Sequence, residues 1–439
     1  MKNDFGVNVA GYINTESGLG EGVRSTLRAL EAARIPLVLN NCDFNREHRK
    51  LDSSFTNFSV ENPYPINLIQ INGDQISRFV DFFGSDYFKN HYNIGYWAWE
   101  MLDFPSEWLA ALTRFDEIWT PSNFCVEAIA PVAKVPVVKM PHAIDLPAPQ
   151  ANRKTLGLPA DKFIFLFIFD FCSLPERKNP QAVVEAFEKA FGRQNPDVLL
   201  IIKSSNGKIL PKQLAALEEQ TQKFSNVKLI NDYLLKDELN ALISESDCYV
   251  SLHRSEGFGL TLAEAMFYGK PVIATEYSAN TDFMNVGNSF PVSYDLRALS
   301  EDSGYFKKGS FWAHPKVEHA AELMRFVFEN RQKAQKIGAK AAADVRRLLS
   351  PPAVGEKMRR RLERIKYLKN DFIQFTDQEK IQIKFDALRF DIEKKNEQVR
   401  QLQSKIQLMK DSRFWKIRNQ WFKSKRFLGI GDAKSAELD

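Results

Sequence analysis

The sequence has few cysteines and no pattern that would link them. Only four occur in 439 residues, and they lie far apart, at Cys42, Cys125, Cys172 and Cys248. No two of them form a Cys-x-x-Cys pair, so neither a zinc site nor a disulfide framework is expected. Such sparse use of cysteine is typical of a reducing compartment, and we expect a cytoplasmic protein.

Long apolar runs are also missing. No stretch approaches the roughly 18 consecutive apolar residues of a membrane-spanning helix, and residues 1–9 lack the apolar core of a secretory signal. The net charge of +5 is small, so the composition does not indicate nucleic-acid binding. A length of 439 residues, of which 44% are hydrophobic, predicts two or three folded domains.

Short apolar runs alternate with helical patterns in the first third of the chain. The expected strands are Val7–Ile13, Ile35–Leu39, Ile66–Ile71, Asn93–Trp97, Glu117–Thr120 and Val135–Met140. Strands that alternate with helices form a parallel sheet covered on both faces. Pro147 and Pro149 then mark a linker.

The same alternation restarts after the linker. The expected strands are Phe163–Phe169, Val198–Ile202, Val227–Ile230, Cys248–Leu252 and Pro271–Thr275. The sequence therefore predicts an α/β fold with two doubly wound domains, 1–148 and 149–350. Ligands of such sheets bind outside the carboxyl ends of the strands, so two facing edges would enclose a cleft.

The most specific motif is Ser255–Ala265, which joins an expected strand to an expected helix. It contains two glutamates, Glu256 and Glu264, separated by seven residues, with Gly257 and Gly259 after the first. Glycine lets backbone amides approach a ligand closely. The start of a helix presents free N–H groups to an anion such as a diphosphate.

This motif, with the Gly-Lys-Pro-Val-Ile-Ala stretch after it, resembles the signature of the family-four retaining glycosyltransferases, the glycosyl transferases group 1. The resemblance covers about residues 6–347 and implies the GT-B fold, two Rossmann-like domains facing across a cleft. It also implies that Glu264 binds the ribose of a nucleotide-sugar donor and that Glu256 holds a hydroxyl of the transferred sugar. The residues expected to surround the donor are Gly257, Phe258, Gly259, Leu260 and Thr261. For Glu264 the alternative is a capping box with Thr261.

A second element, Phe169–Asn179, follows the first strand of the second domain. The family places a diphosphate-binding lysine at the end of this loop, where Lys178 stands, and an arginine about six residues earlier, where this chain has Cys172. A diphosphate leaving group needs positive charge. Either Lys203 or Arg177 could supply the positive charge that is missing at Cys172. For Lys203, a solvated surface charge is the alternative.

Three further positions are candidates for the cleft. Gly18 and Gly20 resemble the family's glycine loop, which faces the donor phosphate and the acceptor, although such a pair often serves only a tight turn. Trp97 and Glu100 end a strand and could face a sugar ring, with a core tryptophan as the alternative. Asn280 follows a later strand and lines either the donor pocket or a polar turn.

No metal or cofactor is expected besides the nucleotide-sugar substrate. The chain contains no Asp-x-Asp, the motif with which the other large glycosyltransferase fold commonly holds a divalent ion. His142 and His253 have no ligand-like spacing to another histidine or cysteine.

The C-terminal part changes character. Residues 351–376 read as a helical connector, and 377–411 as a coiled coil, because apolar residues repeat in heptads over 381–409. This repeat predicts a homodimer, although an amphipathic helix packed on its own domain fits too. The tail, 412–439, begins with a basic aromatic stretch, 412–427, that suits an anionic membrane surface or docking onto the chain's own domain. No nucleic-acid motif accompanies this charge.

Together these features predict a bacterial retaining, metal-independent glycosyltransferase. Its donor would be a UDP- or GDP-sugar, and its acceptor a polysaccharide, a lipopolysaccharide or a lipid-linked glycan. It would work in the cytoplasm or at the inner face of the membrane. Two alternatives remain open: a nucleotide-sugar epimerase, and a non-catalytic GT-B scaffold of a glycan-synthesis complex, which the cysteine at position 172 would permit.

Overall fold

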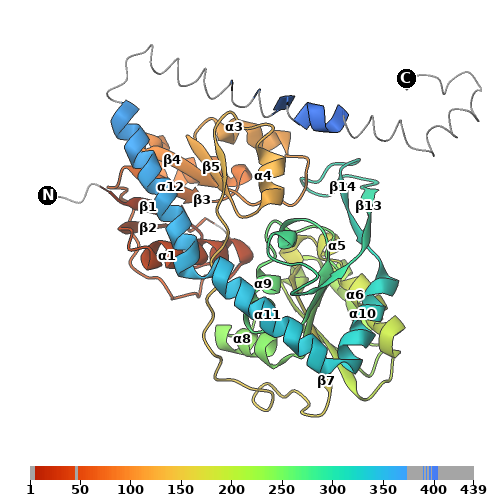
Figure 1. Cartoon of the computed structure of the whole chain (residues 1–439). Coiled ribbons are helices and arrows are strands. Elements are labelled where there is room, and N and C mark those ends of the chain that lie inside the picture. Colours follow the sequence, from red (N-terminus) through yellow and green to blue (C-terminus); the bar gives the residue numbers. More distant parts are fainter. Residues whose placement is uncertain are drawn as a thin grey trace, which may run out of the picture. The chain divides into compact units, whose positions relative to one another are not determined.

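The structure, a computed structural model, describes residues 5–44, 48–372, 389, 392, 395, 396 and 398–403. By its contacts the chain divides into two compact units, Met1–Leu362 and Glu363–Asp439. The first unit contains both α/β domains (Figure 1).

The first domain is built on a parallel six-stranded sheet, in the order β2-β1-β3-β4-β5-β6. Its strands are β1 (Val7–Gly11), β2 (Leu37–Asn41), β3 (Ile66–Gln70), β4 (Tyr92–Tyr96), β5 (Glu117–Thr120) and β6 (Val137–Lys139). Its α-helices are α1 (Gly18–Ala32), α2 (Ile76–Phe83), α3 (Leu109–Leu112) and α4 (Asn123–Ile129). Every residue of β1 and β3 is buried, as expected of central strands covered on both faces.

The second domain repeats this plan, in the order β12-β11-β10-β7-β8-β9. Its strands are β7 (Phe163–Asp170), β8 (Val198–Ser205), β9 (Val227–Asn231), β10 (Cys248–Ser251), β11 (Val272–Thr275) and β12 (Phe290–Val292). Its α-helices are α5 (Pro175–Lys178), α6 (Pro180–Phe191), α7 (Pro211–Thr221), α8 (Lys236–Glu245), α9 (Leu260–Phe267), α10 (Val317–Glu329) and α11 (Arg331–Leu349). The prediction of two doubly wound parallel sheets in the GT-B arrangement is confirmed.

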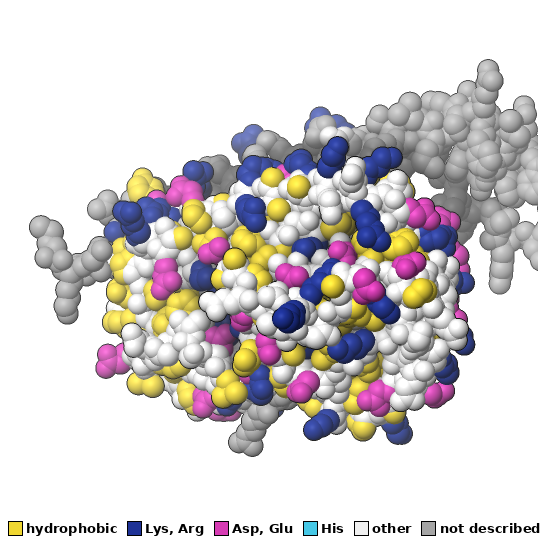
Figure 2. Space-filling view, turned by 90° about the horizontal axis from the view of Figure 1, so that it is seen from below, with side chains coloured by type: hydrophobic (Ala, Val, Ile, Leu, Met, Phe, Trp, Pro, Cys, Tyr) yellow, Lys and Arg dark blue, Asp and Glu magenta, His cyan; other side chains and the backbone are white. Residues whose placement is uncertain are grey.

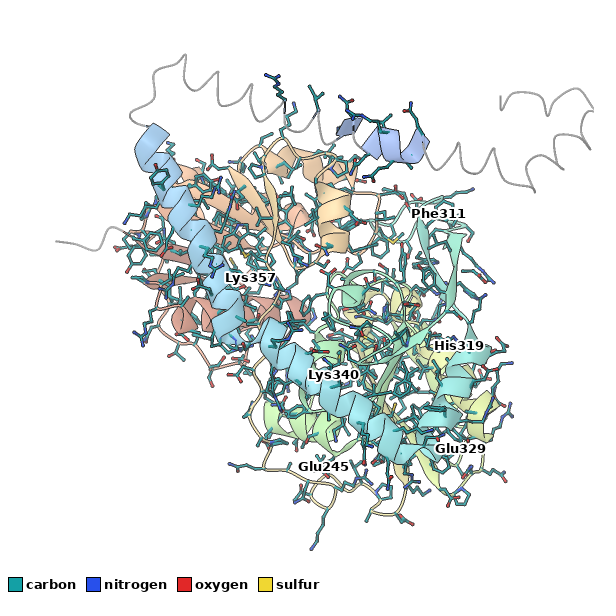
Figure 3. The ribbon with its side chains drawn as sticks, in the orientation of Figure 1. Glu245, Phe311, His319, Glu329, Lys340 and Lys357 are labelled. Carbon is teal, nitrogen blue, oxygen red and sulfur yellow. The ribbon has the colours of Figure 1, made fainter. Side chains whose placement is uncertain are left out.

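An antiparallel hairpin of the second domain packs against the first domain. The sequence did not predict it. It consists of β13 (Tyr294–Ala298) and β14 (Phe311–Pro315), with Phe311 at one end of β14 (Figure 3). In its loop, the ring of Phe306 lies 5.3 Å from that of Trp99, and the ring of Tyr305 lies 5.7 Å from that of Trp108. The two domains therefore share a buried aromatic cluster.

The two chain segments that connect the domains lie side by side. The backbone N–H of Ile144, after β6, donates to the carbonyl of Leu349, at the end of α11, over 2.6 Å. Helix α12 (Pro351–Phe372) then packs on α1 of the first domain, because a Cβ at Gly355 would lie 2.2 Å from the carbonyl oxygen of Ala29. Figure 3 shows this helix with Lys357 labelled.

The predicted coiled coil lies largely outside the described residues. Within 377–411 the structure describes 389, 392, 395, 396 and 398–403, all helical. The side chains of Ile392, Val399 and Leu402 are 56%, 49% and 58% exposed. The dimer therefore stays a prediction, as does membrane binding by the tail, which lies outside the described residues.

In the described part of the chain, no helix combines the length and the apolar character needed to cross a membrane. On the face seen in Figure 2, basic and acidic side chains are interspersed among apolar ones over most of the surface.

Candidate active site

A large cavity opens at the carboxyl ends of both sheets. Its volume is about 1140 Å³. In the first domain its walls come from the segments after β1, β2, β3 and β4, and in the second from the ends of β7, β8, β9 and β10. This is where doubly wound sheets bind their ligands, so the edge predicted from the sequence is the edge that carries the cavity.

Most of the predicted site residues line this cavity. They are Gly18, Glu100, Arg177, Lys178, Lys203, Glu256, Gly257, Phe258, Gly259, Leu260, Thr261 and Glu264.

The centre of the site is an ion cluster around Glu256. The Lys178 Nζ lies 2.5 Å from Glu256 Oε1, and Arg177 Nη1 lies 3.2 Å from Oε2. Burial raises the pKa of Glu256, but the two cations outweigh burial and bring this pKa down to about 2. Burial likewise lowers the pKa of Lys178, against the attraction of Glu256. Glu256 is therefore ionised, and its charge is balanced within the cavity wall.

Arg177 holds the cluster together. It is buried, and it donates to the carbonyls of Ser255 (2.8 Å) and Ser173 (3.1 Å) as well as to Glu256. These bonds tie the loop after β7 to the loop after β10. Arg177 therefore positions Glu256, and Lys178 is better placed to meet a donor.

Lys203 supplies a second cation at the end of β8. Its Nζ donates to the Ser204 carbonyl over 2.9 Å, and only 5% of the residue is exposed. Burial lowers the pKa of Lys203 to about 8, opposed by Asp170. Asp170 itself stays ionised: burial raises its pKa, but hydrogen bonds from His48 and Asn206 bring it down to about 2.

Glu264 lies in α9, with its carboxylate at the cavity. It is 7% exposed, and burial raises its pKa. Its carboxylate oxygens accept no hydrogen bond from the described part of the chain. The capping-box alternative is wrong, because α9 starts at Leu260 with Gly259 as its N-cap, which puts Thr261 inside the helix. An unpaired carboxylate at a cavity wall is suited to two adjacent hydroxyls of a ligand.

Both glycines between the glutamates have a structural reason. Gly259 has a φ of +90°, a conformation that favours glycine. A Cβ at Gly257 would lie 3.3 Å from the carbonyl oxygen of Trp99, so this glycine permits close contact between the domains. Phe258 contacts the ring of His142, whose burial lowers its pKa to about 4 and keeps it neutral.

Three predicted residues lie behind the wall, and these predictions are corrected. Trp97 is fully buried and stacks on Phe104 in the core of the first domain, so it cannot face a sugar. A Cβ at Gly20 would lie 2.1 Å from the carbonyl oxygen of Thr15, so this glycine serves packing. Asn280 is 1% exposed and bonds to His253 and to the Thr275 carbonyl.

The sequence did not reveal one part of the first-domain wall of the cavity. It combines the aromatic rings of Phe44 and Phe82 with the polar side chains of Asp74, Gln75 and Arg78. The last three follow β3, at a carboxyl strand end where a polar group could have been sought. Nothing in the local sequence around Phe44 and Phe82 distinguishes them from core residues.

Comparisons with known proteins agree with this geometry. Residues 149–344 match the family model of the glycosyl transferases group 1. Among curated proteins, none matches the sequence significantly.

Several solved structures share the fold. HepE of Anabaena, solved with UDP and glucose, is 14% identical with a TM-score of 0.57, over 82% of this chain and 99% of its own. Sucrose-phosphate synthase of Thermosynechococcus elongatus is 14% identical with a TM-score of 0.61, over 83% and 100%. A glycosyltransferase of Rickettsia africae is 15% identical with a TM-score of 0.57, over 83% and 99%.

The match covers the domain that carries Lys178, Glu256 and Glu264, and the fold likeness extends over both domains. Residues 149–344 thus match the glycosyl transferases group 1 model, and the chain has the GT-B fold.

Proposed function

We propose that the chain transfers a sugar from a nucleotide-diphosphate sugar to a glycan acceptor, with retention of configuration and without a metal ion. The observation that carries this proposal is the ion cluster in the cavity, where Lys178 and Arg177 hold an ionised Glu256. The fold likeness to HepE, a protein solved with UDP and glucose, favours a UDP-sugar; a GDP-sugar is the other donor to test.

The donor is bound by the second domain. Its diphosphate lies near Lys178 and Lys203, with the start of α9 supplying backbone N–H groups. Its ribose hydroxyls donate to Glu264, and a sugar hydroxyl donates to Glu256. These cations and amides stabilise the charge of the leaving diphosphate, which is the task a metal ion performs in other sites.

Transfer breaks the bond between the anomeric carbon and the diphosphate oxygen and forms one to the acceptor oxygen on the same face. The acceptor proton passes to the leaving diphosphate. The acceptor enters along the first-domain wall of Phe44, Phe82 and Asp74. A polysaccharide, a lipopolysaccharide or a lipid-linked glycan fits this role, and the basic tail would hold the enzyme at the inner membrane face.

The test is the release of UDP or GDP from a panel of nucleotide sugars, with and without acceptor glycans and with EDTA. We expect turnover that an acceptor accelerates and that EDTA leaves unchanged. An epimerase would need no acceptor, and a scaffold would release no nucleotide. Loss of turnover in EDTA, restored by magnesium or manganese, would contradict metal independence.

A further inference from the structure

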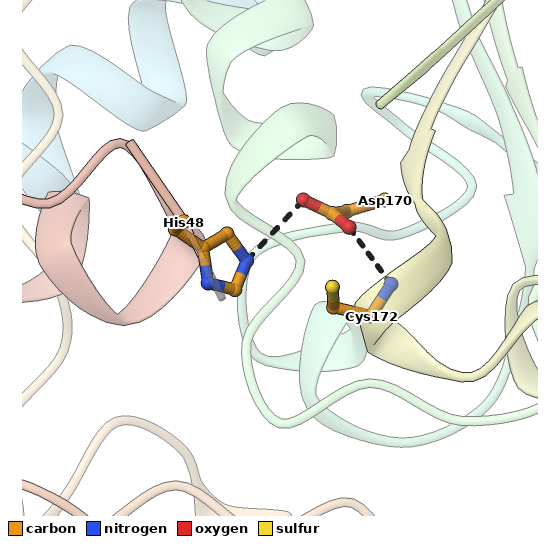
Figure 4. Close-up of side chains that lie close together, drawn as sticks. All are labelled: His48, Asp170 and Cys172. Carbon is orange, nitrogen blue, oxygen red and sulfur yellow. Dashed lines mark hydrogen bonds and ion pairs between the residues drawn. The ribbon is translucent and has the colours of Figure 1, made fainter. Parts of the chain in front are cut away.

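A group of possible metal ligands lies in the same cavity, apart from the ion cluster. It consists of His48, Asp170 and Cys172 (Figure 4). One ligand atom from each lies within 4.8 Å of the other two. All three residues line the cavity, His48 from the first domain, Asp170 and Cys172 from the end of β7 in the second.

We propose that His48, Asp170 and Cys172 form a zinc-binding site that joins the two domains across the cleft. Thiolate, imidazole and carboxylate together are the ligand set that zinc prefers. Zinc bonds of about 2.0–2.3 Å place tetrahedral ligand atoms roughly 3.5 Å apart, so small side-chain rotations complete the set. The fourth position belongs to water.

The surroundings hold the carboxylate in place for this role. Asp170 accepts hydrogen bonds from Asn206 Nδ2 (2.9 and 3.0 Å), Ser205 Oγ (3.1 Å) and the Cys172 backbone N–H (2.8 Å). Partners of this kind orient metal-binding carboxylates. His48 Nε2 already lies 3.5 Å from Asp170 Oδ2, while its buried Nδ1 has no hydrogen-bond partner among the described residues.

Cys172 is also the one cysteine of the chain that is not buried; Cys42, Cys125 and Cys248 are. When zinc binds, the Sγ proton leaves to solvent as the zinc–sulfur bond forms. The bound ion links a first-domain loop to the second domain at the place where the family has its diphosphate-binding arginine. A cleft pinned in this way opens more slowly for its substrate and product. Zinc therefore inhibits turnover. This inhibition rests on the proposed function, whereas the binding of zinc does not.

Metal binding is tested with cobalt(II), which can take the place of zinc and, unlike zinc, gives an absorption band when a thiolate binds it. We expect a thiolate-to-cobalt charge-transfer band in the full-length protein that zinc displaces. The band should disappear in Cys172→Ser and His48→Gln and persist in His314→Gln, a control histidine on β14. Absence of the band from the natural protein, or its persistence in Cys172→Ser, overturns the site.

A second measurement needs no variant. A thiol reagent should modify one cysteine of the folded protein, and zinc should slow this reaction about tenfold or more, because a metal-bound thiolate is shielded. Unchanged labelling in zinc overturns the proposal. For the inhibitory consequence, zinc should reduce nucleotide release, with EDTA restoring it. The two proposals can fail separately. If the protein turns over no nucleotide sugar in EDTA, but the cobalt band forms in the separate binding experiment, the proposed function fails and the site stands.

Discussion

At the scale of single residues, Lys178 is the partner of a buried carboxylate and, in the proposed function, a contact of the donor. Lys178→Ala should reduce kcat/KM by roughly 30- to 1000-fold, the effect of losing about 2–4 kcal/mol of transition-state stabilisation. Because Glu256 loses its nearest cation, the melting temperature should fall as well. Lys189→Ala, on the exposed side of α6, is the control. Turnover close to the natural level in Lys178→Ala would rule out this role.

The two glutamates should respond differently to substitution. Glu264→Ala should weaken binding of the free nucleotide and of the nucleotide sugar alike, because the ribose is common to both. Glu256→Gln should leave the affinity for the free nucleotide unchanged or raise it, because Lys178 is released from its 2.5 Å contact. The same variant should reduce the contribution of the sugar to the affinity for the nucleotide sugar. Calorimetry with both ligands measures this, and equal losses in both variants would contradict the division of roles.

Lys203 should give the enzyme an alkaline limit. With a pKa of about 8, its ammonium is charged below that pH and neutral above it. Attraction for the diphosphate should therefore decline as the pH rises through about 8, and kcat/KM for the donor should fall with it. Lys203→Arg should remove this decline, because arginine remains charged. An unchanged pH profile in Lys203→Arg would show that another group causes it.

The motif around Glu256 was predictable because its residue types and spacing are tied to one chemistry. The segment at the end of β4 shows an alternation of side chains that the sequence-based prediction did not use. Tyr96, Ala98 and Glu100 line the cavity, whereas Trp97 and Trp99 do not and are buried in the core. Alternate residues of an extended chain point to opposite sides. Applying that rule from Glu100 would have placed Trp97 in the core.

At the scale of elements, the strands were predicted well because parallel strands buried on both faces form continuous apolar runs. The β13–β14 hairpin was missed, because two of the five β13 residues are charged and four are exposed. Its role depends on the aromatic loop between the strands, whose partners Trp99 and Trp108 lie in another domain.

Phe306→Ala should therefore weaken the contact between the domains. Phe306 is 9% exposed, and removing a buried phenylalanine side chain costs about 3–5 kcal/mol in a core, with this partly interdomain site at the lower end. We expect a lower melting temperature and a higher KM for the donor. Phe311→Ala, on the same hairpin but 51% exposed, should change neither. Equal effects of both variants would show that the aromatic cluster does not hold the domains.

At the scale of the whole molecule, the described heptad positions favour pairing. Ile392, Val399 and Leu402 are about half exposed, and a second copy would cover them. Truncation at Asp371 should give a monomer that still turns over soluble donor. Truncation at Asp411 should give a dimer that no longer sediments with anionic liposomes. Light scattering decides this; a monomeric full-length chain would favour a helix packed on its own domains.

The adjacent crossings at Ile144 and Leu349 restrict how the domains can move. Two connections that touch act as one pivot, so the second domain can swing but has little freedom to slide or twist. A rotation about this pivot displaces each part of the cleft rim in proportion to its distance from Ile144 and Leu349. Opening and closing of the cleft is therefore controlled with the least interaction energy at the part of the rim farthest from the pivot, because a weak contact there acts with the longest lever arm.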